Sequence, residues 1–189
     1  MMETIGLIQT FKMNLEFTVP PNITFEQAMD LTQDLLVSTP PDTLLESAIT
    51  ALLQTQNGAR GFFVVFLTGD STLADAPTPA LLRALRSNPN AIADLMVKNI
   101  AMPTAMALTH QRNGNDQLAA SSNQTKRRSI HLVQQLNLSE ITTLLRSMQS
   151  TIQTNKGDYQ SFLDRWGYDQ EQRDAIGQVL VLMLASKLA

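Results

Sequence analysis

Residues 61–69 read GFFVVFLTG, and this stretch decides between an all-helical chain and one that also contains a sheet. Its six central residues are all aromatic, β-branched or leucine, and they are apolar at successive positions. A glycine stands on each side of the run. Short apolar runs bounded by glycine are typical of a strand that is buried on both faces. We therefore expect a buried strand over residues 62–67.

A second strand is predicted near the N-terminus, from Ile5 to Val19. Apolar side chains there occupy almost every odd position, and polar ones occupy most even positions. This period of two is typical of a strand with one buried face, and Pro20 and Pro21 end it. Two strands alone bury too little surface to be stable, so we expect helices to cover them.

Most of the remaining chain has the apolar periodicity and capping residues of helices. The sequence therefore predicts an α+β fold, predominantly helical, with about eight helices packed around a small two-strand β element. We expect a single globular domain over residues 1–189, with an acidic part (1–82) that holds both strands and a helical part (83–189). The predicted helix starts are Thr24 with Gln27, Thr43 with Glu46, Thr78-Pro79, Asn88-Pro89, Ser139, and Asp169 with Gln172.

Three interruptions are expected within this helical pattern. Asn57-Gly58 has the composition of a helix end, and it follows the helix that is predicted to begin at Thr43. Pro103 lies inside a helical pattern, where proline removes a hydrogen bond, so a kink or a break is predicted. Residues 119–125 (AASSNQT) are polar and weakly patterned, which favours a flexible loop.

Charge is distributed unevenly along the chain. Residues 1–82 carry nine acids and two bases, whereas residues 83–146 carry three acids and eight bases. Such polarity could steer an anionic or self-complementary partner, or the two regions could face each other within one fold. The net charge of −3 does not suit a nucleic-acid-binding domain, so nucleic acid is not expected as a partner.

The composition also indicates the cellular setting. The chain has no cysteine, which excludes disulfides and cysteine-based metal sites and fits a reducing compartment. Its N-terminus lacks the basic start and unbroken apolar stretch of a signal peptide. The longest apolar run, residues 179–185, is too short to cross a bilayer, which takes about 20 residues. We expect a cytoplasmic or chloroplast-stromal protein with no membrane span.

No motif with a known catalytic mechanism is recognisable, and no cofactor or metal is predicted. The glycines around residues 58–69 do not form a phosphate-binding motif. His110 and His131 have no carboxylate at metal-ligand spacing. Asp70 follows the expected buried strand, where catalytic groups often collect, but it can equally form a local turn with the backbone.

Two cationic segments are candidate binding sites. On a helix, Lys126, Arg127, Arg128 and His131 would form a cluster that could contact phosphate or an acidic protein surface, or simply remain solvated. Arginine and tryptophan are common at the centres of interfaces, which makes the neighbours Arg165 and Trp166 candidates. The alternative for Trp166, which precedes a glycine, is that it anchors a corner between two helices.

Methionines gather around Pro103 in the stretch NIAMPTAMALTH. Methionine adapts to irregular gaps and to varied ligands, so Met96, Met102 and Met106 could line a ligand pocket. They could equally fill the core beside a kinked helix.

These features favour a non-enzymatic protein-interaction, assembly or regulatory factor. Its expected partners are a second copy of itself, through the first strand or the C-terminal helix, or an acidic protein surface. The alternatives are a small-ligand-binding protein with a methionine-lined pocket near Pro103, or a hydrolase-like enzyme that uses Asp70.

Three stretches carry a resemblance to other proteins. They are RGFFVVFLTGDSTLADAP (60–77), NIAMPTAMALTHQRNGN (99–115) and FLDRWGYDQEQRDAIGQVL (162–180). Together with the low lysine content and the many glutamines and threonines, they resemble uncharacterised small soluble proteins of cyanobacteria and chloroplasts. The resemblance implies a soluble cytoplasmic or stromal setting and assigns no functional residue.

Overall fold

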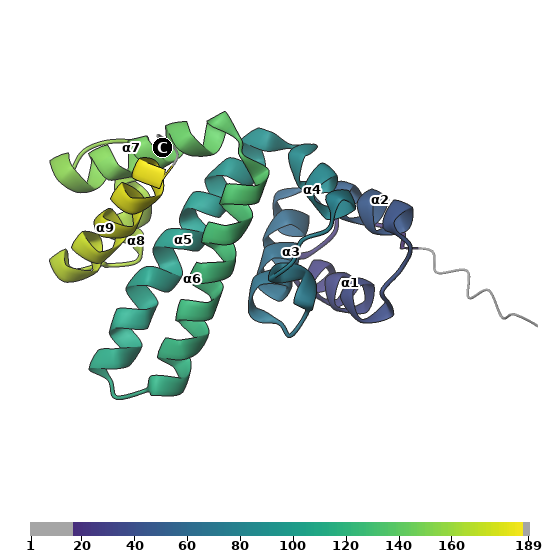
Figure 1. The fold of residues 1–189 in the computed structure, drawn as a ribbon, viewed down its shortest axis with the longest axis horizontal. Coiled ribbons are helices and arrows are strands. Elements are labelled where there is room, and N and C mark those ends of the chain that lie inside the picture. Colours follow the sequence, from purple (N-terminus) through teal and green to yellow (C-terminus); the bar gives the residue numbers. More distant parts are fainter. Residues whose placement is uncertain (1–16, 187–189) are drawn as a thin grey trace, which may run out of the picture.

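The computed structural model describes residues 17–186, and every regular element in this range is helical (Figure 1). The predicted α+β fold is therefore wrong for the described residues, which contain no strand. The helices are α1 (Phe25–Ser38), α2 (Asp42–Leu52), α3 (Gln56–Thr68), the 3₁₀ turn η1 (Thr72–Ala74), α4 (Pro79–Arg86), α5 (Pro89–Arg112), α6 (Asp116–Leu136), α7 (Ser139–Thr154), α8 (Gln160–Arg165) and α9 (Gln170–Ser186).

The apolar run over residues 62–67 lies in the second half of helix α3 and is not a buried strand. Thr55 caps the N-terminus of this helix, because its hydroxyl accepts a hydrogen bond from the backbone N–H of Gly58. A run that is apolar on every face suits a central helix as well as a buried strand, and six residues are too few to separate the two periods. Gly61 bounds no strand: it is the point where α3 lies against α1, because a Cβ there would come within 2.6 Å of the Ala28 Cβ.

The other predicted strand, Ile5 to Val19, lies almost entirely outside the described residues. Its last three residues, 17–19, are described and have no regular secondary structure. The sheet expected between the two strands is therefore not part of the described fold.

Most predicted helix starts agree with the observed helices, whereas the predicted helix end, break and loop do not. Asn57-Gly58 belongs to the first turn of α3 and does not end the preceding helix. Helix α5 continues through Pro103, so a break there is wrong, and residues 119–125 lie within α6 and not in a loop. Packing explains both results: Pro103 and its neighbours Ala101 and Ala105 are buried, and α5 and α6 lie against each other along their length.

The helices form two groups joined by a long central hairpin (Figure 1). In the first group α1 packs on α3 and α2 packs on α4; in the second, α7 and α9 pack on α5 and on each other. The antiparallel helices α5 and α6 lie between the two groups. One apolar core runs through the whole assembly, from Ile23 to Leu184.

Among the described helices, α5 is long and apolar enough to cross a bilayer by length and composition. More than half of its most apolar window is buried against other helices, as in the core helix of a bundle. The expected absence of a membrane span stays a prediction.

Candidate functional site

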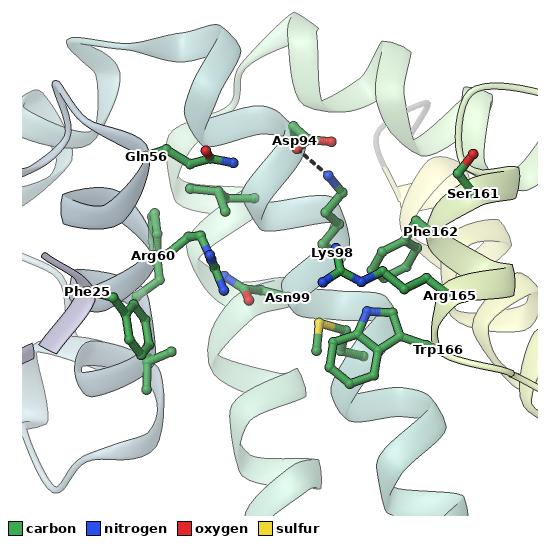
Figure 2. A pocket seen from close by; sticks show the side chains of 14 residues that line it. Phe25, Gln56, Arg60, Asp94, Lys98, Asn99, Ser161, Phe162, Arg165 and Trp166 are labelled. Atoms are coloured by element: carbon green, nitrogen blue, oxygen red, sulfur yellow. Dashed lines mark hydrogen bonds and ion pairs between the residues drawn. The ribbon is translucent and has the colours of Figure 1, made fainter.

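A chemically varied hollow lies between the two helix groups. It has a volume of about 470 Å³ and is lined by α1 and α3 on one side, by α8 on the opposite side and by α5 between them (Figure 2). We call it the groove. Its lining combines four aromatic rings (Phe25, Phe63, Phe162 and Trp166), three cations (Arg60, Lys98 and Arg165), one carboxylate (Asp94), and the side chains of Gln56, Val64, Leu95, Asn99, Met102 and Ser161.

The α3 wall of the groove presents a cation over an aromatic ring. The guanidinium of Arg60 lies 5.4 Å from the centroid of the Phe25 ring, which α1 contributes. The two helices approach each other closely at the next residue, Gly61, where no side chain separates their backbones. No carboxylate of the described residues forms an ion pair with Arg60.

The α5 wall carries an ordered ion pair. Lys98 Nζ lies 2.6 Å from Asp94 Oδ2 one helical turn away, and it also lies 5.8 Å from the centroid of the Phe162 ring. The Tyr159 hydroxyl donates a hydrogen bond to the other oxygen of Asp94 at 3.2 Å. Burial and the neighbouring Asp94 raise the pKa of Tyr159, so the phenol stays protonated and continues to donate. Asp94 is thus held from two sides and fixes the ammonium of Lys98.

The α8 wall contributes Arg165 and Trp166, the pair that the sequence singled out. The side chain of Trp166 is 50% exposed, so it does not anchor a buried corner. The corner is packed instead by Phe162 and Tyr168, whose rings meet edge to face at 6.1 Å. Arg165 forms no ion pair with any described carboxylate, and its head group extends into the groove toward Arg60 (Figure 2).

Asn99 is the polar group of the groove that the protein leaves unsatisfied. Its Nδ2 is buried and has no hydrogen-bond partner among the described atoms. In Figure 2 the amide lies between the head groups of Arg60 and Arg165. A buried donor without an acceptor costs about 1–3 kcal/mol.

The predicted cationic cluster on α6 is not a single surface. Arg128 points inward and its side chain is only 5% exposed. Its guanidinium donates to both carboxylate oxygens of Asp75, at 2.9 and 2.7 Å, and to the carbonyl oxygens of Leu67 and Gly69 at 3.1 and 2.6 Å. We call this set of contacts the Arg128 clamp. It ties α6 to the end of α3 and to the loop after it.

The other members of that cluster have different surroundings. Arg127 is exposed, while Lys126 and His131 are partly buried, and none of the three lines the groove. Burial is the main cause that lowers the pKa of Lys126, followed by the charge of Arg127. Contact of these residues with an acidic protein surface stays a prediction.

The three methionines near Pro103 also separate. Met96 is fully buried in the core, Met106 is partly buried, and only Met102 lines the groove. Asp70 is exposed and follows a helix, so the strand end on which its catalytic interpretation rested does not exist. No group of three or more potential metal ligands occurs among residues 17–186.

A second hollow of about 600 Å³ lies between α7 and α9. It is lined by Ile152, Gly177, Val181 and Leu182 together with polar side chains of both helices. Leu182 is 70% exposed and Val181 is 49% exposed. This surface contains the apolar C-terminal helix that the sequence proposed for self-association.

Several groove residues had no distinctive signal in the sequence. Arg60 and Lys98 are isolated bases, and Phe25 and Asn99 resemble ordinary helix residues. For these residues the sequence offers one indication of a site: Asp94 and Lys98 are four residues apart, which brings the two side chains together on a helix.

Comparison with known proteins gives one family assignment. No curated protein and no solved structure matches the chain. A family model described as "Uncharacterised conserved protein UCP020893" matches residues 24–183, which include every residue that lines the groove and the whole Arg128 clamp. This match agrees with the resemblance to uncharacterised proteins noted from the sequence, and the chain belongs to that family.

Proposed function

We propose that this protein acts by binding and that the groove takes up a small organic anion. The observation that carries the proposal is the set of three cations facing one carboxylate around an aromatic-lined hollow of about 470 Å³. Ligand sites commonly have this size and this mixture of apolar walls with a few convergent polar groups. This proposal keeps one part of the ligand-binding hypothesis for a methionine-lined pocket near Pro103, because Met102 lines the groove.

The sign of the ligand's charge follows from the pairing of the cations. Lys98 is neutralised by Asp94, whereas Arg60 and Arg165 have no carboxylate partner among the described residues. Both guanidinium groups are exposed and extend into the same hollow, so an anionic ligand between them could accept hydrogen bonds from both.

The aromatic walls favour a ligand that also has an apolar part. The indole of Trp166 remains half exposed at the groove, and Phe162 and Met102 lie beside it. Aromatic and thioether side chains bind flat apolar groups through dispersion and ring contacts.

Isothermal titration calorimetry with 1-naphthoate and its neutral amide, 1-naphthamide, tests the proposal. We expect 1-naphthoate to bind at a single site and 1-naphthamide to bind at least about tenfold more weakly, because the arginines recognise charge. Replacing both arginines, Arg60→Ala with Arg165→Ala, should abolish this difference. Arg127→Ala removes an exposed cation outside the groove and serves as the control. Equal binding of the two probes to the wild-type protein would refute the proposal.

A second candidate function, self-association, is favoured by the exposed side chains of Val181 and Leu182. Both side chains lie at the hollow between α7 and α9. In a dimer with twofold symmetry, each copy could insert its Leu182 into this hollow of the other copy. Burying such a side chain contributes about 1.5–3 kcal/mol, whereas association costs about 4–15 kcal/mol. The expected product is a weak dimer. A regulatory role, and the cytoplasmic or stromal location, stay predictions.

Sedimentation equilibrium distinguishes the dimer from a monomer. The wild-type protein should approach twice the chain mass of 20.9 kDa at high concentration, and Leu182→Glu should return it to the monomer mass. Val37→Glu is the matched control, since Val37 is equally exposed but lies on α1. A wild-type protein that stays monomeric, or an equal effect of both variants, would exclude α9 as the contact.

A further inference from the structure

We propose that the anion bound in the groove is a phosphate monoester of a planar ring compound. This inference rests on the proposed function and specifies its ligand class. It starts from the directions in which the donors of the groove lie.

The donors approach one region of the groove from several directions. Arg60 extends from α3 and Arg165 from α8 on the opposite wall, and the Asn99 amide of α5 lies between their head groups (Figure 2). A carboxylate has two oxygens in one plane, and a single guanidinium can engage both of them. A phosphate monoester has three terminal oxygens that point in different directions. Donors on opposite walls therefore fit phosphate better than carboxylate.

The charge of the groove agrees with this assignment. Asp94 neutralises Lys98, which leaves the charges of Arg60 and Arg165 to be balanced. A phosphate monoester carries a charge of about −1.5 to −2 at neutral pH. A single carboxylate would balance only half of the excess.

The unsatisfied Asn99 amide gives an independent indication of a ligand at the same place. Its Nδ2 is buried without an acceptor, although buried donors are nearly always hydrogen-bonded. Two of the three phosphate oxygens suffice for the two arginines, and the third would reach this amide once the Asn99 side chain turns toward the groove, because its Nδ2 is closed to solvent in the structure.

The part of the ligand other than the phosphate is inferred from the side chains that lie beside the arginines. Trp166 follows Arg165 directly in the chain, and its half-exposed indole lies below the Arg165 head group in the view of Figure 2. A planar ring joined to the phosphate through a short linker could stack on this indole while the phosphate remains between the arginines. Nucleoside monophosphates have this arrangement of groups.

Calorimetric titration with four probes tests the inference: adenosine 5′-monophosphate, adenosine, ribose 5-phosphate and 1-naphthoate. We expect adenosine 5′-monophosphate to bind at least about fivefold more tightly than each of the others, because only it supplies both the ring and the phosphate. Trp166→Ala should weaken binding of adenosine 5′-monophosphate and leave that of ribose 5-phosphate nearly unchanged. Arg165→Ala should weaken both, and Arg127→Ala should weaken neither.

The pH dependence gives a second readout. Binding of adenosine 5′-monophosphate should weaken between pH about 7.5 and about 5, because the phosphate gains a proton near pH 6. The charged side chains that face the site (Arg60, Lys98, Arg165 and Asp94) are common to all probes, so 1-naphthoate, which keeps its charge, serves as the control.

The outcomes separate this inference from the proposed function. If 1-naphthoate binds in preference to its amide but adenosine 5′-monophosphate binds no better than 1-naphthoate or ribose 5-phosphate, the phosphate inference is wrong and the anion site stands. If none of the anionic probes binds, both are wrong.

Discussion

The groove and the Arg128 clamp use the same side chain in opposite ways. At the clamp, one arginine is buried and donates to a carboxylate and to two backbone carbonyl groups. In the groove, Arg60 and Arg165 have no carboxylate partner among the described residues, and a buried amide beside them has no acceptor. An arginine surrounded by acceptors of its own chain ties segments of the fold together, whereas the arginines without such acceptors are the ones that we propose bind a ligand.

The largest expected effect comes from breaking the clamp. Arg128→Ala removes hydrogen bonds to two carbonyl oxygens and to Asp75 and leaves a gap between α6 and the end of α3. Hydrogen bonds to a charged group contribute about 1.5–3 kcal/mol, so we expect the free energy of unfolding to fall by about 2–4 kcal/mol. Urea denaturation measures it.

Arg127→Ala is the control for this variant, because it removes the neighbouring exposed cation of the same helix. Its free energy of unfolding should change by less than about 0.5 kcal/mol. A similar loss in both variants would show that the charge of α6, and not the clamp, stabilises the protein.

The opposite result, a loss of ligand binding without a loss of stability, is expected for the groove arginines. Arg165→Ala should weaken binding of 1-naphthoate by about tenfold while the free energy of unfolding changes by less than about 0.5 kcal/mol. Calorimetry and urea denaturation on the same preparation measure the two quantities. A large loss of stability without a loss of binding would mean that Arg165 is a structural residue like Arg128.

A smaller effect is expected from the pH dependence of the clamp. Hydrogen bonds from Arg128 hold the pKa of Asp75 below its ordinary value of 3.8. The ion pair therefore stabilises the fold fully above the pKa of the unfolded chain, and this contribution is lost as the pH falls through the lower folded value. The difference in stability between wild type and Asp75→Asn should be constant at neutral pH and shrink below pH about 4.

The measurement for this prediction is urea denaturation as a function of pH. Asp34→Asn removes an exposed carboxylate of α1, far from the clamp in sequence and without an ion pair among the described residues, and serves as the control. A difference between wild type and Asp75→Asn that persists unchanged in acid would show that the pair does not depend on the ionised carboxylate.

The smallest effect concerns the only tryptophan of the chain. Because Trp166 is half exposed beside Arg165, iodide should quench its fluorescence more effectively than caesium does. Arg165→Ala should reduce the preference for the anion. Emission that neither ion quenches would place Trp166 in the core and contradict the exposed wall of the groove.

Most helix starts could be predicted from local sequence. Two predicted caps, Thr24 with Gln27 and Asp169 with Gln172, form reciprocal hydrogen bonds between the side chain of one residue and the backbone N–H of the other. Thr78-Pro79 likewise starts α4, because a cap and a proline act through contacts within one turn. By contrast, the pair Thr43 and Glu46 forms no cap, since α2 begins at Asp42 after Pro41.

The candidate site could be predicted only in part. Arg165, Trp166 and Met102 were identified from their residue types, and each lines the groove. Arg60 and Asn99 were not, because nothing within one helical turn distinguishes them. Their role depends on which residues of distant segments lie opposite.

The sequence by itself determined the predominance of helix, the positions of most helix caps and the absence of cysteine chemistry, since these depend on neighbours in the chain or on composition. Only the tertiary structure decided that residues 62–67 are helical, because a short run that is apolar on all faces takes its secondary structure from what surrounds it. The tertiary structure also decided the roles of the arginines. Arg128 meets acceptors some 50 to 60 residues away, while Arg60 and Arg165 meet none among the described residues, and no local pattern encodes that difference.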